Sequence, residues 1–389
     1  MQDIGVDPYG IKIMLPKAIT HLVRLKSVSN IAANILKQEI LSLGGDAAVA
    51  RDALTGKARK TDCLLMGNLS QFRGLSGKLN EQPFGLGKLA GDLSRTLTNY
   101  QKDNFTLDLG RYKLNLAKRT HVMGIVNATP DSFSGDGLYS RQSSVVSRQD
   151  LGCILDYVYG LVEDGADIID VGGESSRPGA KAVSVKEELN RTIPLIKALA
   201  KKIKKPISVD SCKPEVAKGA LDNGAVMVND ISGLRNPGMA KTVAKYKAGV
   251  VIMHMLGKPR SMQKNPQYSC LIEEIIGYLD CAIKRAEDSG IDREKIIVDP
   301  GIGFGKLMEH NLEILKRLAE FRVLGRPILV GTSRKSFIGK ILNVQPQERV
   351  FGTVATCVSA VQNGAKIVRV HDVKGVRQAL KVLDAINQR

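Results

Sequence analysis

Two kinds of polar side chain recur at the ends of short apolar segments, and each kind suits a different ligand. Asp210, Asn229 and Asp299 offer short acceptors and an amide, which suit a flat, nitrogen-rich heterocycle that presents several N–H donors. The same three side chains could instead bind a hard metal ion. An amide and a spread over three segments fit a dedicated carboxylate cage less well, so the heterocycle is the favoured ligand.

The second kind is cationic or carries a hydroxyl, and it suits a phosphate or diphosphate. Its members are Ser176, Arg177, Lys335, Ser336, Arg369 and His371. Arginine offers a fork of donors to such anions, and the segment GTSRKSFIGKIL enters a predicted short helix whose first amides can also donate. Any one of these residues could form an ordinary surface ion pair, but the set together favours an anion site.

Eight short apolar segments, which alternate with amphipathic helices, must position these side chains. Strands are expected at His121–Asn127, Asp167–Gly173, Pro206–Asp210, Met227–Ile231, Gly249–Met255, Ile296–Gly301, Pro327–Thr332 and Ile367–Asp372. Eight such units predict an α/β fold, the (β/α)8 TIM barrel, whose polar strand ends converge on one mouth. A doubly wound open sheet is the alternative, and it would normally show a single glycine fingerprint after its first strand.

Two further parts are expected before the barrel. Residues 105–118, FTLDLGRYKLNLAK, alternate around Gly110 and predict a hairpin that plugs the lower end of the barrel. Residues 1–103 predict a small α/β accessory domain of unknown role, with the barrel domain at 104–389. The expected elements of the accessory domain are a strand at His21–Val28, a helix at Ile31–Leu43, a strand at Cys63–Met66, a glycine-rich stretch and a helix at Leu86–Tyr100.

The composition narrows the class of protein. The 389 residues carry a net charge of +18, but the Lys and Arg residues are spread along the chain and tryptophan is absent, so we expect no nucleic-acid partner. The chain has no apolar run long enough to span a bilayer and no secretory signal, so we expect no membrane partner. Six scattered cysteines without a C-x-x-C pair suit a reducing compartment, and we expect a cytoplasmic protein.

From about residue 105 to the C-terminus, the chain resembles the dihydropteroate synthase family. The resemblance lies in the ordered motifs Asn127–Phe133, Asp170–Gly179, Ser208–Ala217, Asn229–Gly233, His254–Gln263, Asp299–Lys306, Ser333–Gly339 and Arg369–Val373. It implies condensation of 6-hydroxymethyl-7,8-dihydropterin diphosphate with 4-aminobenzoate, which gives 7,8-dihydropteroate and diphosphate in folate synthesis and is the step that sulfonamides inhibit. It also suggests a homodimer.

The resemblance implies a role for each site residue. The pterin would be held by Asp210, Asn229, Asp299 and Lys335 in a pocket lined by Met253, Phe304 and Gly331. Ser176, Arg369 and His371 would bind the diphosphate, with Mg²⁺ as cofactor held against it by Asn127. A first loop, Thr129–Gly137, and a second loop, Glu174–Gly179, would close over the aminobenzoate. The expected contacts are Thr129, Pro130, Asp131, Phe133, Ser176, Arg177, Pro178, Lys335 and Ser336. Arg369, His371, Lys335, Asp210 and Asp299 are therefore the expected catalytic set.

Departures from the family pattern are small, and the rival functions differ in their use of the anion set. Ala128 stands where valine is more usual, and Ser176 stands where threonine is usual.

A pterin-binding methyltransferase that uses methyltetrahydrofolate has a similar barrel but no need of the diphosphate residues. A non-catalytic pterin-binding scaffold would not need the two loops. The acceptor could also be a substituted relative of 4-aminobenzoate.

Overall fold

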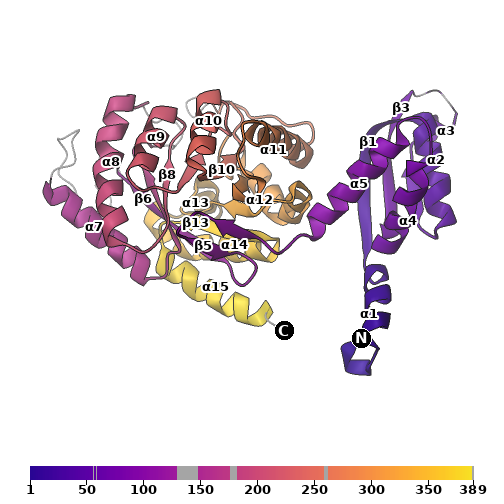
Figure 1. Cartoon of the computed structure of the whole chain (residues 1–389), viewed down its shortest axis with the longest axis horizontal. Helices are drawn as coiled ribbons and strands as arrows, with labels where there is room; N and C mark the ends of the chain where they lie inside the picture. Colours follow the sequence, from indigo (N-terminus) through magenta and orange to yellow (C-terminus); the bar gives the residue numbers. More distant parts are fainter. Residues whose placement is uncertain (56, 58, 129–147, 176–181, 258–261, 388–389) are drawn as a thin grey trace. The chain divides into compact units, whose positions relative to one another are not determined.

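The computed structural model describes residues 1–55, 57, 59–128, 148–175, 182–257 and 262–387. These residues divide into two compact units, Met1–Gln101 and Lys102–Arg389 (Figure 1). Each unit has its own apolar core. No helix within the described residues is long and apolar enough to cross a membrane.

The second unit is a closed barrel of eight parallel strands, which confirms the TIM barrel prediction. Its strands are β6 (His121–Asn127), β7 (Ile168–Gly172), β8 (Ile207–Asp210), β9 (Met227–Asp230), β10 (Gly249–Met253), β11 (Ile296–Asp299), β12 (Ile328–Val330) and β13 (Ala365–Val370). Each strand pairs with its neighbours in the chain, and β13 closes the barrel against β6. All eight polar strand ends therefore lie at the same end of the barrel.

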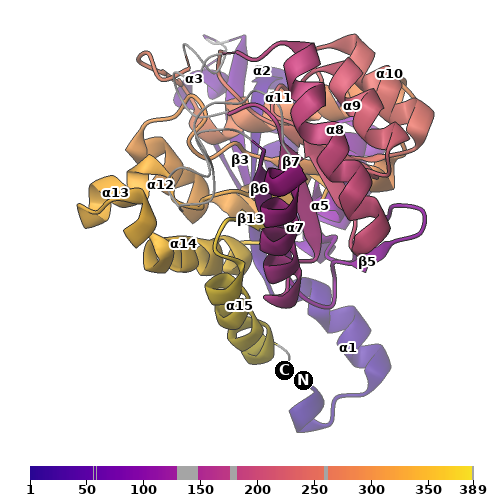
Figure 2. The same ribbon diagram turned by 90° about the vertical axis from the view of Figure 1, so that its left-hand side faces the viewer.

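Helices surround the strands, as Figures 1 and 2 show. They are α7 (Arg148–Glu163), α8 (Val185–Lys202), α9 (Pro214–Asp222), α10 (Pro237–Tyr246), α11 (Leu271–Asp288), α12 (Met308–Lys316), α13 (Ser336–Leu342), α14 (Val350–Gln362) and α15 (Val373–Asn387), with short 3-10 turns at Arg293–Lys295, Leu318–Leu324 and Pro346–Glu348. Their apolar faces pack on the outward side chains of the strands, such as Val122, Val209 and Val250. The strands are buried on both faces, which explains their continuous runs of β-branched residues.

A hairpin of β4 (Thr106–Asp108) and β5 (Lys113–Asn115) fills the lower end of the barrel, as the alternating sequence predicted. Its apolar side chains, Phe105, Leu107, Leu109 and Leu116, pack against inward side chains near the beginnings of the strands, including Met123, Ile168, Met227, Val251, Ile297, Leu329 and Ile367. A Cβ on Gly249 would lie 2.6 Å from Leu109 Cδ2, so a larger residue here would force the Leu109 side chain to shift.

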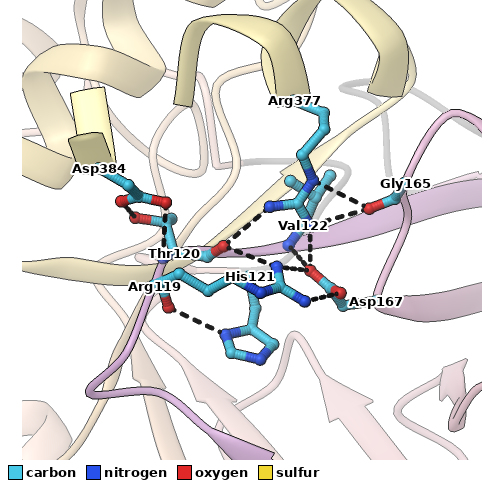
Figure 3. Close-up of polar contacts among 8 residues, drawn as sticks. All are labelled: Arg119, Thr120, His121, Val122, Gly165, Asp167, Arg377 and Asp384. Atoms are coloured by element: carbon cyan, nitrogen blue, oxygen red, sulfur yellow. Dashed lines mark hydrogen bonds and ion pairs between the residues drawn. The ribbon is translucent and has the colours of Figure 1, made fainter. Parts of the chain in front are cut away.

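An ion-pair network joins the start of the barrel to its last helix (Figure 3). Asp167, just before β7, accepts hydrogen bonds from Arg119 at 2.6 and 2.9 Å and from the Val122 amide at 3.0 Å. Arg377, from α15, also contacts Asp167 and donates to the carbonyl of Gly165 at 2.8 Å. The network therefore links β6, β7 and α15.

Some strands end earlier than the sequence predicted, and the cause lies in the backbone. The expected strand Ile296–Gly301 ends at Asp299 because Pro300 has no amide to donate and Gly301 adopts a φ of +72°. The strand expected at Gly249–Met255 ends at Met253. These early ends place more of each polar motif in a turn.

The first unit is a three-stranded antiparallel sheet packed with helices. Its elements are a 3-10 turn (Gln2–Ile4), α1 (Pro8–Met14), a second 3-10 turn (Leu15–Lys17), β1 (Thr20–Ser29), α2 (Asn30–Ser42), β2 (Asp46–Val49), α3 (Arg51–Leu54), β3 (Lys60–Asn68), α4 (Leu69–Asn80) and α5 (Leu86–Gln101), with strand order β1-β3-β2. The glycine-rich stretch contains helix α4, which the sequence reasoning missed. Asn68 and Gln71 exchange the two hydrogen bonds of a capping box at its start.

Candidate active site

Arg369 lies at the centre of the polar barrel mouth. Its guanidinium, on β13, donates to Asp170 of β7 at 2.6 Å and to Asp210 of β8 at 2.7 Å. Asn229, at the end region of β9, donates from its amide to the same Asp170 oxygen at 3.0 Å. Four strands thus contribute to one network, in which Asp210, Asn229 and Arg369 come together as the sequence predicted.

This network places charged side chains in a buried part of the barrel, where charge is costly. Burial raises the pKa of Asp210 to about 7, and the nearby charge of Asp170 adds to this, whereas Arg369 opposes it. Burial alone would lower the pKa of Arg369, but the two carboxylates outweigh that effect and raise it. The second oxygen of Asp170, Oδ1, is buried and has no hydrogen-bond partner within the described part of the chain. Such a site has acceptors available for a donor-rich ligand.

Asp299 and Lys335 form the other half of the mouth. Asp299 is 6% exposed and accepts a hydrogen bond from the Gly301 amide at 2.7 Å. Burial raises its pKa to about 6, although Lys335 and Arg369 both act to lower it. Burial also lowers the pKa of Lys335 to about 8, against the attraction of Asp299. Asp299 and Lys335 therefore each favour the charged form of the other, against the effect of burial.

The pocket residues expected from the sequence lie beside these charges. The Lys335 ammonium lies 4.2 Å from the centre of the Phe304 ring, a cation–π contact. Met253 and Phe304 belong to one small apolar cluster at the mouth. Gly331 lies beside Arg369, whose Cβ is 3.8 Å from the position that a Cβ on Gly331 would take.

His371 and Ser336 flank the same end of the barrel. His371 follows β13, and its Nδ1 lies 3.0 Å from the hydroxyl of Ser333, which also accepts a hydrogen bond from the His371 amide at 3.1 Å. Ser336 begins α13 and is exposed. Arg334 pairs with Asp372 at 2.6 and 3.0 Å, which ties the loop after β12 to the loop after β13.

Asn127 ends β6 next to Gly172. Its amide oxygen and a carboxylate oxygen of Asp210 both lie 3.8 Å from the position of a Cβ on Gly172. Two hard oxygen atoms therefore border the space beside this glycine. The described residues contain no cluster of three or more His, Cys, Asp or Glu side chains with the geometry of a metal site.

Several predicted contacts fall in the two loops outside the described residues. These are Thr129, Pro130, Asp131, Phe133, Ser176, Arg177 and Pro178. The described start of the second loop is firmly held: Glu174 accepts a hydrogen bond from Lys213 at 2.5 Å, and Lys213 also donates to the Val183 carbonyl at 2.8 Å.

Sequence reasoning missed three groups that the structure places among the site residues. Asp170 joins Arg369 to Asn229, although the sequence analysis assigned it no role of its own. Ser333 was not assigned to His371. Lys306 lies buried between Phe304 and His254. The signal for Asp170 was a charged residue inside an otherwise apolar strand, which is costly without a partner.

Comparison with known proteins places this site in a family. The family model described as pterin binding enzyme matches residues 123–371. The dihydropteroate synthase of Synechocystis is 47% identical over 282 residues, which cover 72% of this chain and 94% of that protein. The solved structure of the Xanthomonas albilineans dihydropteroate synthase with 4-aminobenzoic acid is 41% identical, with a TM-score of 0.67 over 74% of this chain and 99% of that one.

The first unit also has a relative. A probable bifunctional folylpolyglutamate synthase/dihydropteroate synthase from Halobacterium salinarum is 39% identical over 381 residues, or 98% of this chain and 44% of that protein. That match is too long to be confined to the barrel unit. Because the family model covers most of the barrel and the Synechocystis relative matches nearly end to end, this chain belongs to the pterin binding enzyme family and, within it, to the dihydropteroate synthases.

Proposed function

We propose that this barrel joins 6-hydroxymethyl-7,8-dihydropterin diphosphate to 4-aminobenzoate and releases diphosphate and 7,8-dihydropteroate. The observation that carries the proposal is the meeting of two ligand sets at one mouth. Asp210 accepts a hydrogen bond from Arg369 at 2.7 Å, and Asn229 donates to Asp170 at 3.0 Å. Arg369 also donates to Asp170, so it supplies a fixed cation beside both ligand groups. This pairing fits a substrate that is a flat heterocycle at one end and an anion at the other.

The pterin end is assigned to the acidic side of the mouth. Asp210, Asn229 and Asp299 accept from or donate to the edge of the ring, while Met253 and Phe304 cover its faces. As the diphosphate leaves with the electron pair of its C–O bond, positive charge develops on the pterin. An ionised Asp299 stabilises that charge, and a low-polarity surrounding strengthens its effect.

The diphosphate end is assigned to Arg369 and His371, together with Ser176, while Lys335 is assigned to the pterin. The pKa of Arg369 is raised, so its charge is permanent, and it lies near the strand ends at which a departing anion would collect. The arylamine nitrogen then forms the new C–N bond and loses one proton. No side chain is needed as a nucleophile, so the protein contributes mainly position and charge.

A magnesium ion fits this arrangement as a cofactor. The amide oxygen of Asn127 beside Gly172 offers one hard ligand, and Mg²⁺ commonly takes only one or two protein ligands with the remainder from water and substrate phosphates. When bound, Mg²⁺ would neutralise charge on the leaving diphosphate.

The direct test supplies the pterin diphosphate and Mg²⁺ with and without 4-aminobenzoate and measures diphosphate release. We expect release that depends on the arylamine. Diphosphate release that does not depend on the arylamine, or no diphosphate release at all, would contradict the proposal. The variant D299N should bind a pterin much more weakly in calorimetry, and unchanged affinity would remove the role assigned to Asp299.

Two further properties belong to the proposal. We infer a homodimer, as the family resemblance suggests, and light scattering of the purified chain will determine its mass. We also infer a cytoplasmic enzyme, because the six cysteines are all free, which suits a reducing compartment. Cell fractionation tests this location.

A further inference from the structure

The turn that follows Asp299 contains a buried lysine, Lys306, that the proposed reaction does not use. Lys306 is 3% exposed, and its ammonium donates to the Phe304 carbonyl at 3.0 Å and lies 2.9 Å from Nδ1 of His254. Burial lowers the pKa of Lys306 to about 7, with Asp299 opposing that change and Lys335 adding to it. A buried ammonium is costly, so its retention here calls for an explanation.

His254 is the hydrogen-bond acceptor for the Lys306 ammonium. Burial and the charges of Lys306 and Arg235 lower the pKa of His254 to about 2, so the imidazole is neutral near pH 7. With Nδ1 accepting from Lys306, the single ring proton belongs on Nε2. The ring packs edge-on against Tyr278, with centroids 5.0 Å apart and planes at 87°. His254 is therefore a fixed, uncharged acceptor.

The backbone of the turn is packed closely against the end of β10. Gly301, Gly303 and Gly305 all have positive φ angles, of +72°, +82° and +62°. A Cβ on Gly301 would lie 1.9 Å from the His254 carbonyl oxygen, which no side chain allows. Lys306 holds the far end of this turn through the Phe304 carbonyl, and the Phe304 ring in turn faces Lys335.

We propose that Lys306 is a positioning residue of the active site, which fixes the turn after Asp299 through the Phe304 carbonyl and His254 and places a buried positive charge behind the Asp299 side of the mouth. This inference rests on the proposed function, since it assigns Asp299 the task of facing the pterin. Lys306 does not touch the substrate in this assignment. Lys306 would affect the reaction only through the charge of Asp299 and the position of Phe304.

Three cations face Asp299 from three elements. Lys335 precedes α13, Arg369 lies on β13, and Lys306 precedes α12, and each acts to lower the pKa of Asp299 against the effect of burial. The charge of Arg369 is shared with its two carboxylate partners, Asp170 and Asp210. Lys306 has only neutral hydrogen-bond partners, His254 and a carbonyl, in the described structure. Its charge therefore acts on Asp299 without a closer competing anion.

Loss of the Lys306 charge should raise the pKa of Asp299. Below pH 7, Lys306 is protonated and holds the pKa of Asp299 down; without that charge, the pKa of Asp299 should rise by about one unit, the lower end of the range for a nearby charge. Above pH 7, Lys306 loses its proton, so a variant without the charge should approach the wild type there. A purely structural defect would lower activity at every pH.

The experiment compares the full-length variants K306M, K306Q and K306R with K316Q, which removes an exposed lysine at the end of α12. The acid limb of kcat/KM for the pterin diphosphate should move up by about one pH unit in K306M and K306Q. It should stay in place in K306R and K316Q. Equal acid limbs in K306M, K306Q and the wild type would overturn the inference.

A second measurement does not depend on turnover. The chain labelled with ¹³C at aspartate carboxyls allows Asp299 to be titrated by NMR, with its signal identified by its absence in D299N. A higher pKa of Asp299 in K306Q than in K316Q supports the inference, and equal values overturn it. If the wild type releases no diphosphate, the proposed function fails, while this titration still decides whether Lys306 sets the charge of Asp299.

Discussion

The network around Asp167 allows a quantitative test of what closes the barrel (Figure 3). The perturbation is D167N, which keeps the shape of the side chain and removes its charge. Burial alone would raise the pKa of Asp167, but the hydrogen bonds from Arg119 and Val122 and the charge of Arg377 lower it from 3.8 to about 2. A change of that size corresponds to roughly 2.5 kcal/mol of stability above pH 4.

Geometry gives a similar magnitude. The Arg377 side chain is 7% exposed, and D167N leaves its guanidinium with carbonyl partners but no anion. Breaking a buried pair from one side costs about 3 to 5 kcal/mol. We therefore expect D167N to lower the free energy of unfolding by about 3 kcal/mol at pH 7. R377M should cost less, about 1 to 2 kcal/mol, because Asp167 keeps Arg119 and the Val122 amide.

Denaturant unfolding followed by circular dichroism measures these differences, with K381M on the exposed side of α15 as the matched control. K381M should stay within about 0.5 kcal/mol of the wild type. The folded-state pKa of Asp167 lies below its unfolded value, so its stabilisation is present above pH 3.8 and is lost as pH falls through about 2. The difference in the free energy of unfolding between D167N and the wild type should therefore shrink over that pH range. A gap that is absent at pH 7, or unchanged at low pH, would refute the reasoning.

Three further predictions concern the mouth. The pH profile of kcat/KM should be bell-shaped, rising as Asp299 and Asp210 ionise near pH 6 and pH 7 and falling as Lys335 loses its proton near pH 8, and a flat profile across this range would contradict the roles given to all three. Replacing Gly301 by alanine should abolish folding or activity because its Cβ would meet the His254 carbonyl, whereas alanine at Gly277, an open helical site, should be tolerated; thermal melts of both variants test the contrast. Chelation by EDTA should stop diphosphate release and added Mg²⁺ should restore it, so full activity in EDTA would exclude the proposed metal.

The sequence predicted the barrel well because its strands carry an unmistakable physical signature. Runs such as Ile296–Asp299 are buried on both faces, and the polar residue of this run stands where the strand reaches the mouth. The hairpin was predicted for a related reason, since its alternation has one face to bury. Helix α4 was missed because its glycines conceal a helix that the Asn68 and Gln71 cap and tertiary packing stabilise.

The candidate site was only partly predictable. Strand order along the chain placed Asp210, Asn229, Asp299 and Arg369 at one mouth, and this needed no knowledge of side-chain contacts. Which groups pair could not be read from the sequence, because Asp170 and Arg369 lie 199 residues apart and meet only through barrel closure. The same holds for Lys306 and His254, whose contact depends on how one turn packs against another strand.

The two carboxylates that hold Arg369 also bear on how the enzyme can finish a cycle. An anion that recruits this guanidinium must compete with Asp170 and Asp210, which already contact it at 2.6 and 2.7 Å. With Arg369 in its proposed role, part of the binding energy of diphosphate would therefore be spent in displacing these internal counter-ions. The same carboxylates would pair with Arg369 again as the product dissociates, so they would weaken the binding of released diphosphate and favour its release. Where product release limits turnover, a tighter hold on the anion would make a slower catalyst.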